Sequence, residues 1–145
     1  MLLDLIRKAE DAARDLPQCE FQTNHHFANG MYAREIFMAA GTFAIGKMHK
    51  QEHFFMITKG KIQIATEEGS EIFEAPGFVV ARPGTKRALF VLEDAICISV
   101  HKTDKTDLDE IEKEVMEDDP LALFDARNQL KNPALNAQKE LSCLG

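Results

Sequence analysis

The chain contains no tryptophan, one tyrosine and only three cysteines among its 145 residues. The absence of tryptophan excludes a carbohydrate site built on stacked indole rings. The cysteines are Cys19, Cys97 and Cys143, which form no CxxC pair, so we do not expect them to be metal ligands. The net charge is −7 and no basic cluster stands out, so nucleic acid is not an expected partner.

Long apolar runs are also missing. The N-terminal stretch has a short apolar start followed by early acids, which indicates neither a signal peptide nor a membrane span. We therefore expect a cytoplasmic protein with no membrane partner. A chain of 145 residues is the size of a single domain.

The apolar pattern changes period near residue 31. Apolar residues at helical spacing predict an amphipathic helix over residues 2–15, and residues 18–30 are polar and end in a turn signal. Apolar residues then alternate with polar ones, as in strands. The predicted strands are residues 31–38, 42–48, 54–58, 61–66, 71–74, 77–81, 88–92 and 95–101. Short strands separated by glycine and proline turns are typical of a barrel or sandwich.

Helical spacing returns after the last predicted strand. Thr106 is the expected N-cap of a second helix, and a weaker helical signal spans residues 121–130. We expect the chain end to be loosely held and docked on a partner subunit. The predicted organisation is an N-terminal helix (1–17), a β-barrel domain (18–103) and a C-terminal helical segment with a tail (104–145).

The strongest candidate for a functional site in the sequence is the histidine pair His49 and His53. On one straight strand two residues four apart lie about 13 Å from each other, too far to share an ion. If the polar residues 50–52 turn, both rings converge at the mouth of a barrel. Neutral imidazole suits zinc, iron, nickel or copper, and the expected cofactor is a divalent transition metal, namely zinc, nickel, iron or manganese.

A catalytic metal usually needs three protein ligands and an open position. The third ligand could be His101, at the far end of the last predicted strand, or His26 or Glu52. The alternative is that the histidines are polar residues of the barrel mouth, hydrogen-bonded to neighbours or water. His25 and His26 are expected in a loop.

Two segments resemble the conserved motifs of the cupin superfamily. Residues Gly41–Gly60 are similar to the first motif, which runs Gly, five residues, His-x-His, three or four residues, Glu, six residues, Gly. The alignment places His49 on the second motif histidine, Lys47 on the first and His53 on the glutamate. The segment from Gly77 resembles the second motif, with Arg87 at its last ligand position.

The resemblance covers roughly residues 30–101 and implies an all-β cupin-type barrel, a double-stranded β-helix or jelly roll, with N-terminal and C-terminal α-helices. Because Lys47 and Arg87 are cations, the usual four-ligand metal site is not assumed. The segments Tyr32–Glu35 and Gly46–His49, among others, also resemble small single-domain cupins of phage and prophage genomes, a family without an assigned reaction. That likeness would place the protein in the host cytoplasm.

Four side chains form a second candidate site. Tyr32 and Arg34 alternate along one strand and share a face, and Lys47 and Arg87 could point at the same cavity. Together they would bind an anionic small molecule through charge-assisted hydrogen bonds. The alternative is that they are solvated or ion-paired residues of the barrel rim.

Three functions follow from these observations. The first is a homodimeric cupin that binds a small polar ligand and a metal at His49 and His53; exposed sheet edges and apolar helix stripes favour the dimer. The second is a metal-dependent cupin enzyme, an oxygenase or isomerase, with His49, His53 and His101 as a three-histidine site. The third is a structural or assembly protein of a phage particle.

Overall fold

The computed structural model describes residues 1–136, so the end of the expected tail, residues 137–145, lies outside the described residues. The helices are α1 (Leu2–Ala13), α2 (Leu108–Val115) and a 3₁₀ turn, η1 (Pro133–Leu135). The strands are β1 (Gln22–Ala28), β2 (Met31–Met38), β3 (Phe43–Ile45), β4 (His53–Thr66), β5 (Gly69–Glu74), β6 (Gly77–Ala81) and β7 (Ala88–Lys102).

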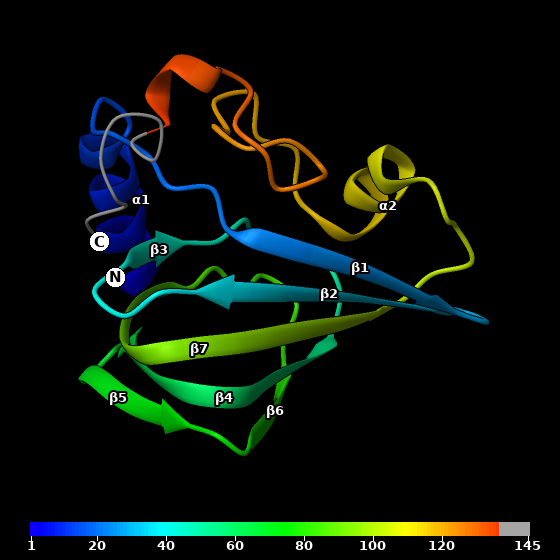
Figure 1. Ribbon diagram of the computed structural model, residues 1–145, viewed down its shortest axis with the longest axis horizontal. Helices are drawn as coiled ribbons and strands as arrows, with labels where there is room; N and C mark the ends of the chain where they lie inside the picture. Colours follow the sequence, from blue (N-terminus) through cyan, green and yellow to red (C-terminus); the bar gives the residue numbers. More distant parts are fainter. Residues whose placement is uncertain (137–145) are drawn as a thin grey trace.

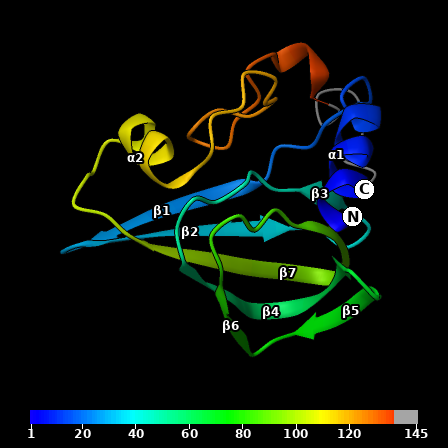
Figure 2. The ribbon, with the colours of Figure 1, turned by 180° about the vertical axis from the view of Figure 1, so that it is seen from behind.

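The strands form one curled antiparallel sheet. Figure 1 shows β1, β2, β7, β4 and β5 side by side in that order. β3 pairs with β7, and β6 pairs with β4. In the view from behind, β6 and its connecting loops lie in front of β7 (Figure 2). Because β6 pairs with β4, the sheet curls back on itself and closes the second side of the barrel.

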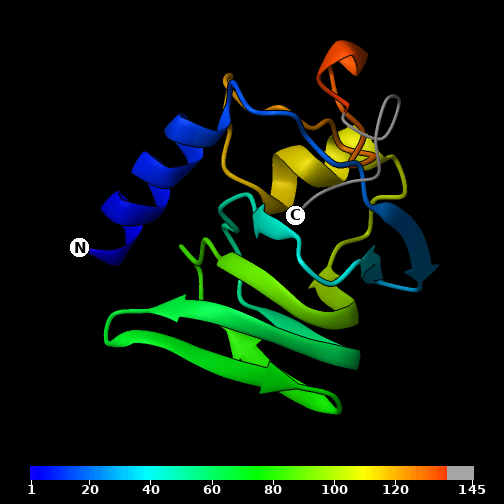
Figure 3. The ribbon, with the colours of Figure 1, turned by 60° about the vertical axis from the view of Figure 1, so that its left-hand side comes forward.

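The two α-helices, α1 and α2, lie on the same side of the strands, as Figure 3 shows. The side chain of Asp107 caps α2 by accepting hydrogen bonds from the backbone N–H groups of Asp109 and Glu110. The apolar face of α2 buries Ile111 and Val115 against Tyr32 of β2. Helix α2 therefore covers one end of the barrel interior. Among residues 1–136, no helix combines the length and apolar character needed to cross a membrane.

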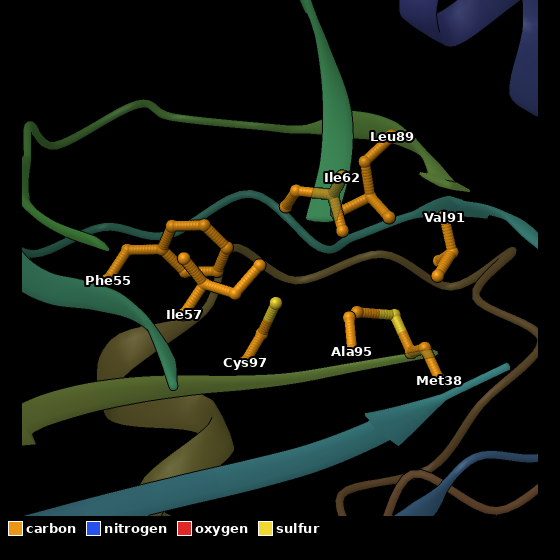
Figure 4. Close-up of a cluster of buried hydrophobic side chains, with 8 residues drawn as sticks. All are labelled: Met38, Phe55, Ile57, Ile62, Leu89, Val91, Ala95 and Cys97. Carbon is orange, nitrogen blue, oxygen red and sulfur yellow. The ribbon is translucent and has the colours of Figure 1, made fainter. Parts of the chain in front are cut away.

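The hydrophobic core fills the other end of the interior (Figure 4). Alternate residues of β4 and β7 point inward, because side chains of a strand alternate between its two faces. The cluster consists of eight buried residues, Met38, Phe55, Ile57, Ile62, Leu89, Val91, Ala95 and Cys97. Ile62 and Val91 have no exposed surface, so they mark its centre.

Several predicted boundaries were wrong. Residues 22–28 form strand β1 instead of a loop, because their backbone pairs with β2 although their side chains are largely polar. The predicted strand 42–48 shrinks to β3. Lys59-Gly60 and Glu93-Asp94 interrupt no strand: each lies inside a long one, β4 or β7.

Gly60 explains why the pattern near it was misread. Its φ of 84° lies in the left-handed region, and the register between β4 and β7 shifts around it, so it forms a bulge in place of a turn. A Cβ atom at Gly60 would lie 2.1 Å from the carbonyl oxygen of Asp94, which only glycine avoids.

The C-terminal helix predictions also need correction. Helix α2 begins after Asp107, so Asp107 and not Thr106 is its N-cap. Residues 121–130 are not helical; the segment turns back on itself through a bridge between Phe124 and Leu130. Asp125 accepts hydrogen bonds from the backbone N–H groups of Arg127 and Gln129, which holds this turn in place of a helix.

Candidate metal centre

Three histidines reach the covered end of the barrel from separate parts of the chain. His53 opens β4, and His101 is the last residue but one of β7. Because Phe54 pairs with Val100, His53 and His101 are neighbours across the two strands and share the interior face. His49 lies before β4, where its backbone bridges to Thr85 and Met116.

The three imidazole rings stack on one another. The centroids of His49 and His53 are 4.1 Å apart, those of His53 and His101 4.5 Å, and those of His49 and His101 4.9 Å. One candidate ligand nitrogen from each residue lies within 4.8 Å of the others. The chain bends over residues 50–52, as the sequence requires for convergence, and all three side chains are at most 4% exposed.

The tautomer of His53 follows from its surroundings. Its Nδ1 lies 2.9 Å from the backbone carbonyl oxygen of Gln51, and a carbonyl can only accept, so Nδ1 carries the proton and donates it. Nε2 of His53 therefore presents a lone pair. That atom is buried and has no hydrogen-bond partner among the described residues. A histidine held through Nδ1–H to a backbone carbonyl, with Nε2 free, is the usual arrangement of a metal ligand.

The other two histidines form a pair. Nδ1 of His49 lies 2.9 Å from Nε2 of His101, so one nitrogen donates to the other. The Nδ1 atom of His101 is buried without a partner within residues 1–136. Two nitrogens that bind one ion at about 2.0–2.1 Å and at right angles are about 3 Å apart, so the spacing of this pair fits a shared ion.

The electrostatic environment keeps the imidazoles neutral. Burial first, and then the facing charges of His53 and two arginines, lower the pKa of His101 to about 3. The pKa of His49 is lowered even more than that of His101. Burial is the main cause, and the charges of His53 and His101 add to it. The pKa of His53 is lowered mainly by burial, although its hydrogen bond to Gln51 opposes this. Neutral imidazole is the form that binds a metal.

Three of the four residues predicted to bind a polar ligand lie at this end of the barrel. Tyr32 pairs with His101 and Arg34 with Ser99 across β2 and β7, so both face the interior. The guanidinium carbon of Arg87 lies 3.9 Å from the centroid of the Phe55 ring. The charges of Arg34 and Arg87 act on all three histidines.

Lys47 is engaged elsewhere. Its ammonium group lies 2.8 Å from a carboxylate oxygen of Glu112 and donates to the backbone carbonyl of Phe124 at 2.9 Å. Lys47 also lines a surface cavity with residues of α1, such as Arg7 and Glu10. Its charge is thus used to attach the C-terminal segment to the barrel.

The remaining histidines lie on β1 and do not join the cluster. Nδ1 of His25 is 2.6 Å from the hydroxyl oxygen of Tyr32, and His26 pairs with Glu35 at 3.1 Å. Of the three candidates for a third ligand, the structure thus brings His101 to the pair. The contact between Tyr32 and His25, and the role of Glu112, had no local signal in the sequence because they depend on strand pairing and helix packing.

A cavity of about 410 Å³ adjoins the histidine cluster. His53 and His101 line it together with the apolar residues Phe54, Val80 and Val100. Two of the three histidines are therefore next to a space that could admit a small molecule. The cavity had no signal in the sequence.

Comparison with known proteins reveals likeness in structure alone. No family model matches the chain, and no curated protein matches it. A cupin-2 domain-containing protein from Shewanella frigidimarina superposes with a TM-score of 0.48 at 12% identity, covering 66% of this chain and 92% of that one. A Salmonella typhimurium protein described as ethanolamine utilization protein Q gives 0.50 at 13% identity, covering 61% and 73%. A Cupin 2 conserved barrel domain protein from Salinispora arenicola gives 0.46 at 15%, covering 58% and 76%.

Identities this low bear on the fold alone. The antiparallel strand order, the curled sheet and the flanking helices agree with the all-β architecture expected from the two sequence motifs. The chain therefore folds as an all-β barrel of one curled antiparallel sheet with helices at its flanks.

Proposed function

We propose that the protein binds one divalent transition metal ion through His49, His53 and His101 and holds a small polar ligand beside it. The observation that carries this proposal is the Nε2 lone pair of His53, which is buried in the cluster without a hydrogen-bond donor among the described residues. A buried polar atom without a partner is destabilising unless something else satisfies it. A metal ion would do so.

The alternative of ordinary hydrogen-bonded histidines accounts for less of the geometry. It explains the contact between His49 and His101, in which one nitrogen donates to the other. It leaves Nε2 of His53 and Nδ1 of His101 without partners in the described part of the chain. An ion would use the first of these and would be surrounded by three neutral nitrogens.

The donor set limits the choice of metal. Three imidazoles without a thiolate suit zinc, nickel or iron(II), and manganese less well, because imidazole is a borderline ligand. Three protein ligands also leave at least one coordination position open. The small polar ligand of the proposal would take that position or lie next to it.

Metal analysis of protein purified without a histidine tag tests the proposal. After equilibration with each metal and removal of the excess, we expect about one ion per chain. His53→Ala should weaken binding at least a hundredfold, because it removes a ligand and even the hydrogen-bond partners of ligands typically contribute about ten- to a hundredfold. The matched control is His26→Ala, which removes an exposed histidine that pairs with Glu35 outside the cluster. Less than about 0.2 ion per chain, or equal binding by the two variants, would reject the site.

Other functions expected from the sequence stay predictions. A metal-dependent oxygenase or isomerase would use the same three histidines, and a phage structural protein would use none of them. The homodimer is part of our proposal, and its support is the strand order, which leaves β1 and β5 at the two ends of the sheet path.

A further inference from the structure

The polar end of the barrel contains two guanidinium groups, those of Arg34 and Arg87, that form no ion pair within the described part of the chain. Within residues 1–136, the guanidinium of Arg34 makes no ion pair and no hydrogen bond, and its Nε is fully shielded from solvent. The guanidinium of Arg87 lies over the Phe55 ring and near the thiol of Cys97. Arginine stays charged inside proteins, so a buried guanidinium needs an anion or a set of acceptors.

The groups nearest these arginines cannot supply the missing negative charge. The charge of Glu112 acts on Arg34, but this carboxylate already pairs with Lys47 at 2.8 Å. Burial raises the pKa of the Tyr32 phenol and of the Cys97 thiol to about 12 in each case, so both are neutral. Residues 1–136 therefore supply no unpaired anion to either guanidinium.

The two guanidiniums lie over the same part of the interior. Arg34 of β2 pairs with Ser99 of β7, and Ser99 pairs in turn with Phe55 of β4, so the three form one row across the inner face. Arg87 reaches this row from the segment before β7, since its guanidinium lies over the Phe55 ring. The adjoining row carries His101 and His53.

We infer that Arg34 and Arg87 form a binding site for a small oxyanion, a carboxylate or phosphate group, beside the three histidines. A guanidinium matches both groups because it can donate two parallel hydrogen bonds to a pair of oxygens. The inference names the ligand of the proposed function and rests on it where a metal is concerned. The two arginines would nonetheless attract the anion in the metal-free protein as well.

The presence of a metal would strengthen the case for an anion. Three neutral histidines contribute no charge, so an ion among them would add two positive charges to those of Arg34 and Arg87. Like charges repel more strongly in a poorly solvated interior than in water. An oxyanion bound to the arginines would offset this repulsion. The anion should therefore raise metal affinity, and by linkage the metal should raise anion affinity to the same extent.

Calorimetric titration of metal-stripped protein tests the anion site directly. Inorganic phosphate and succinate would be titrated separately at low ionic strength, with sodium chloride as the ionic-strength control. We expect saturable binding of at least one of the two, and the stronger one identifies the oxyanion class. Arg34→Gln should weaken it at least tenfold, because a hydrogen bond to a charged group is lost. The matched control is Arg82→Gln, at an exposed arginine outside the barrel interior, which should bind like the wild type.

A second variant keeps the test decisive if Arg34→Gln folds poorly, as circular dichroism would show. Arg34→Lys retains the charge but loses the guanidinium that can donate two parallel hydrogen bonds. Its affinity for the anion should therefore fall less than that of Arg87→Gln, which loses the charge as well. No saturable binding of phosphate or succinate, or equal binding by wild type and the arginine variants, would overturn the inference. If the protein binds a metal but no anion, the inference fails and the proposed metal site stands. If it binds an anion but no metal, the proposed function fails and the inference stands.

Discussion

Strand β7 passes through both ends of the barrel, and its inward side chains differ between them. Near its start it contributes Leu89 and Val91 to the apolar cluster, whereas near its end Ser99 and His101 occupy the equivalent inward positions. Both sets are buried, so burial does not explain the difference. The apolar end gains stability from every buried side chain, whereas the polar end contains nitrogens that have no hydrogen-bond partner among the described residues.

This contrast separates stability from binding within a single sheet. A barrel built for stability alone would continue the apolar pattern of β7 to its end. The polar end gives up part of that stability, and strained or unsatisfied groups of this kind are expected where a protein binds something. The predictions below use substitutions at each end to test the division.

The largest effect is expected in the apolar end. Ile62→Ala removes a side chain with no exposed surface and leaves a cavity, so we expect the free energy of unfolding to fall by about 3 kcal/mol. Urea denaturation measures it. Metal binding should be unchanged in the protein that remains folded.

The control for that substitution is Ile72→Ala on β5, whose side chain is 54% exposed. It should change the free energy of unfolding by no more than about 0.5 kcal/mol. An equal loss in the two variants would mean that the cluster around Ile62 is not the main source of stability.

The next largest effect is the loss of stability at acidic pH, which arises from the histidines of the polar end. In the folded protein the pKa of His101 is about 3, below the ordinary histidine pKa of 6.5, so the unfolded chain binds the proton more readily. The stabilising effect of the neutral ring is complete above pH 6.5 and is lost as the pH falls toward 3. At pH 5 the loss from His101 alone should be about 2 kcal/mol.

Urea denaturation of the metal-free protein at pH 7.5 and pH 5 checks this loss. His101→Leu should remove its share of the pH dependence, because leucine has no proton to bind. Ile62→Ala should retain the full dependence, since it lies in the apolar end. A variant without His101 that was as acid-sensitive as the wild type would contradict the assignment.

The smallest expected change in the free energy of unfolding concerns helix α2, which covers the polar end of the barrel. Asp107→Ala removes the N-cap of α2 and should lower stability by about 1 kcal/mol. Amide hydrogen exchange should speed up at Lys50, which donates to the carbonyl of Val115, and at Glu117, which donates to that of Met48.

Amides of β4 and β7 in the apolar end should exchange at their wild-type rates in that variant. Asp104→Ala is the control, since Asp104 is exposed and does not cap the helix. Faster exchange throughout the sheet would show that α2 supports the whole barrel and not the polar end alone.

Local patterns predicted much of the fold. The two-residue period predicted most of the barrel strands, and the resemblance of two motifs to the cupin superfamily predicted the all-β barrel with flanking helices that the structure has. β1 was missed because its residues 22–28 are largely polar, and backbone pairing with β2 holds it in the sheet. The continuity of β4 was missed because Gly60 is equally compatible with a turn and a bulge, and only the contact with Asp94 distinguishes them.

The candidate site was predictable in its residue types and not in its geometry. The spacing of His49 and His53 indicated convergence on condition that the intervening residues turn, which they do. The sequence could not choose among His101, His26 and Glu52, because the register between β4 and β7 decides it. The partner of Lys47 was hidden for a similar reason, since Glu112 lies 65 residues further along the chain.

The contact between His49 and His101 joins residues 52 positions apart in the chain. Such a contact is unfavourable before the segments between the two residues have folded, because closing the loop reduces chain entropy and no other interaction compensates for it. An ion held there would act as a cross-link across that loop. It would select the completed barrel over every partly folded form and slow the unfolding of the end that the apolar core does not reach.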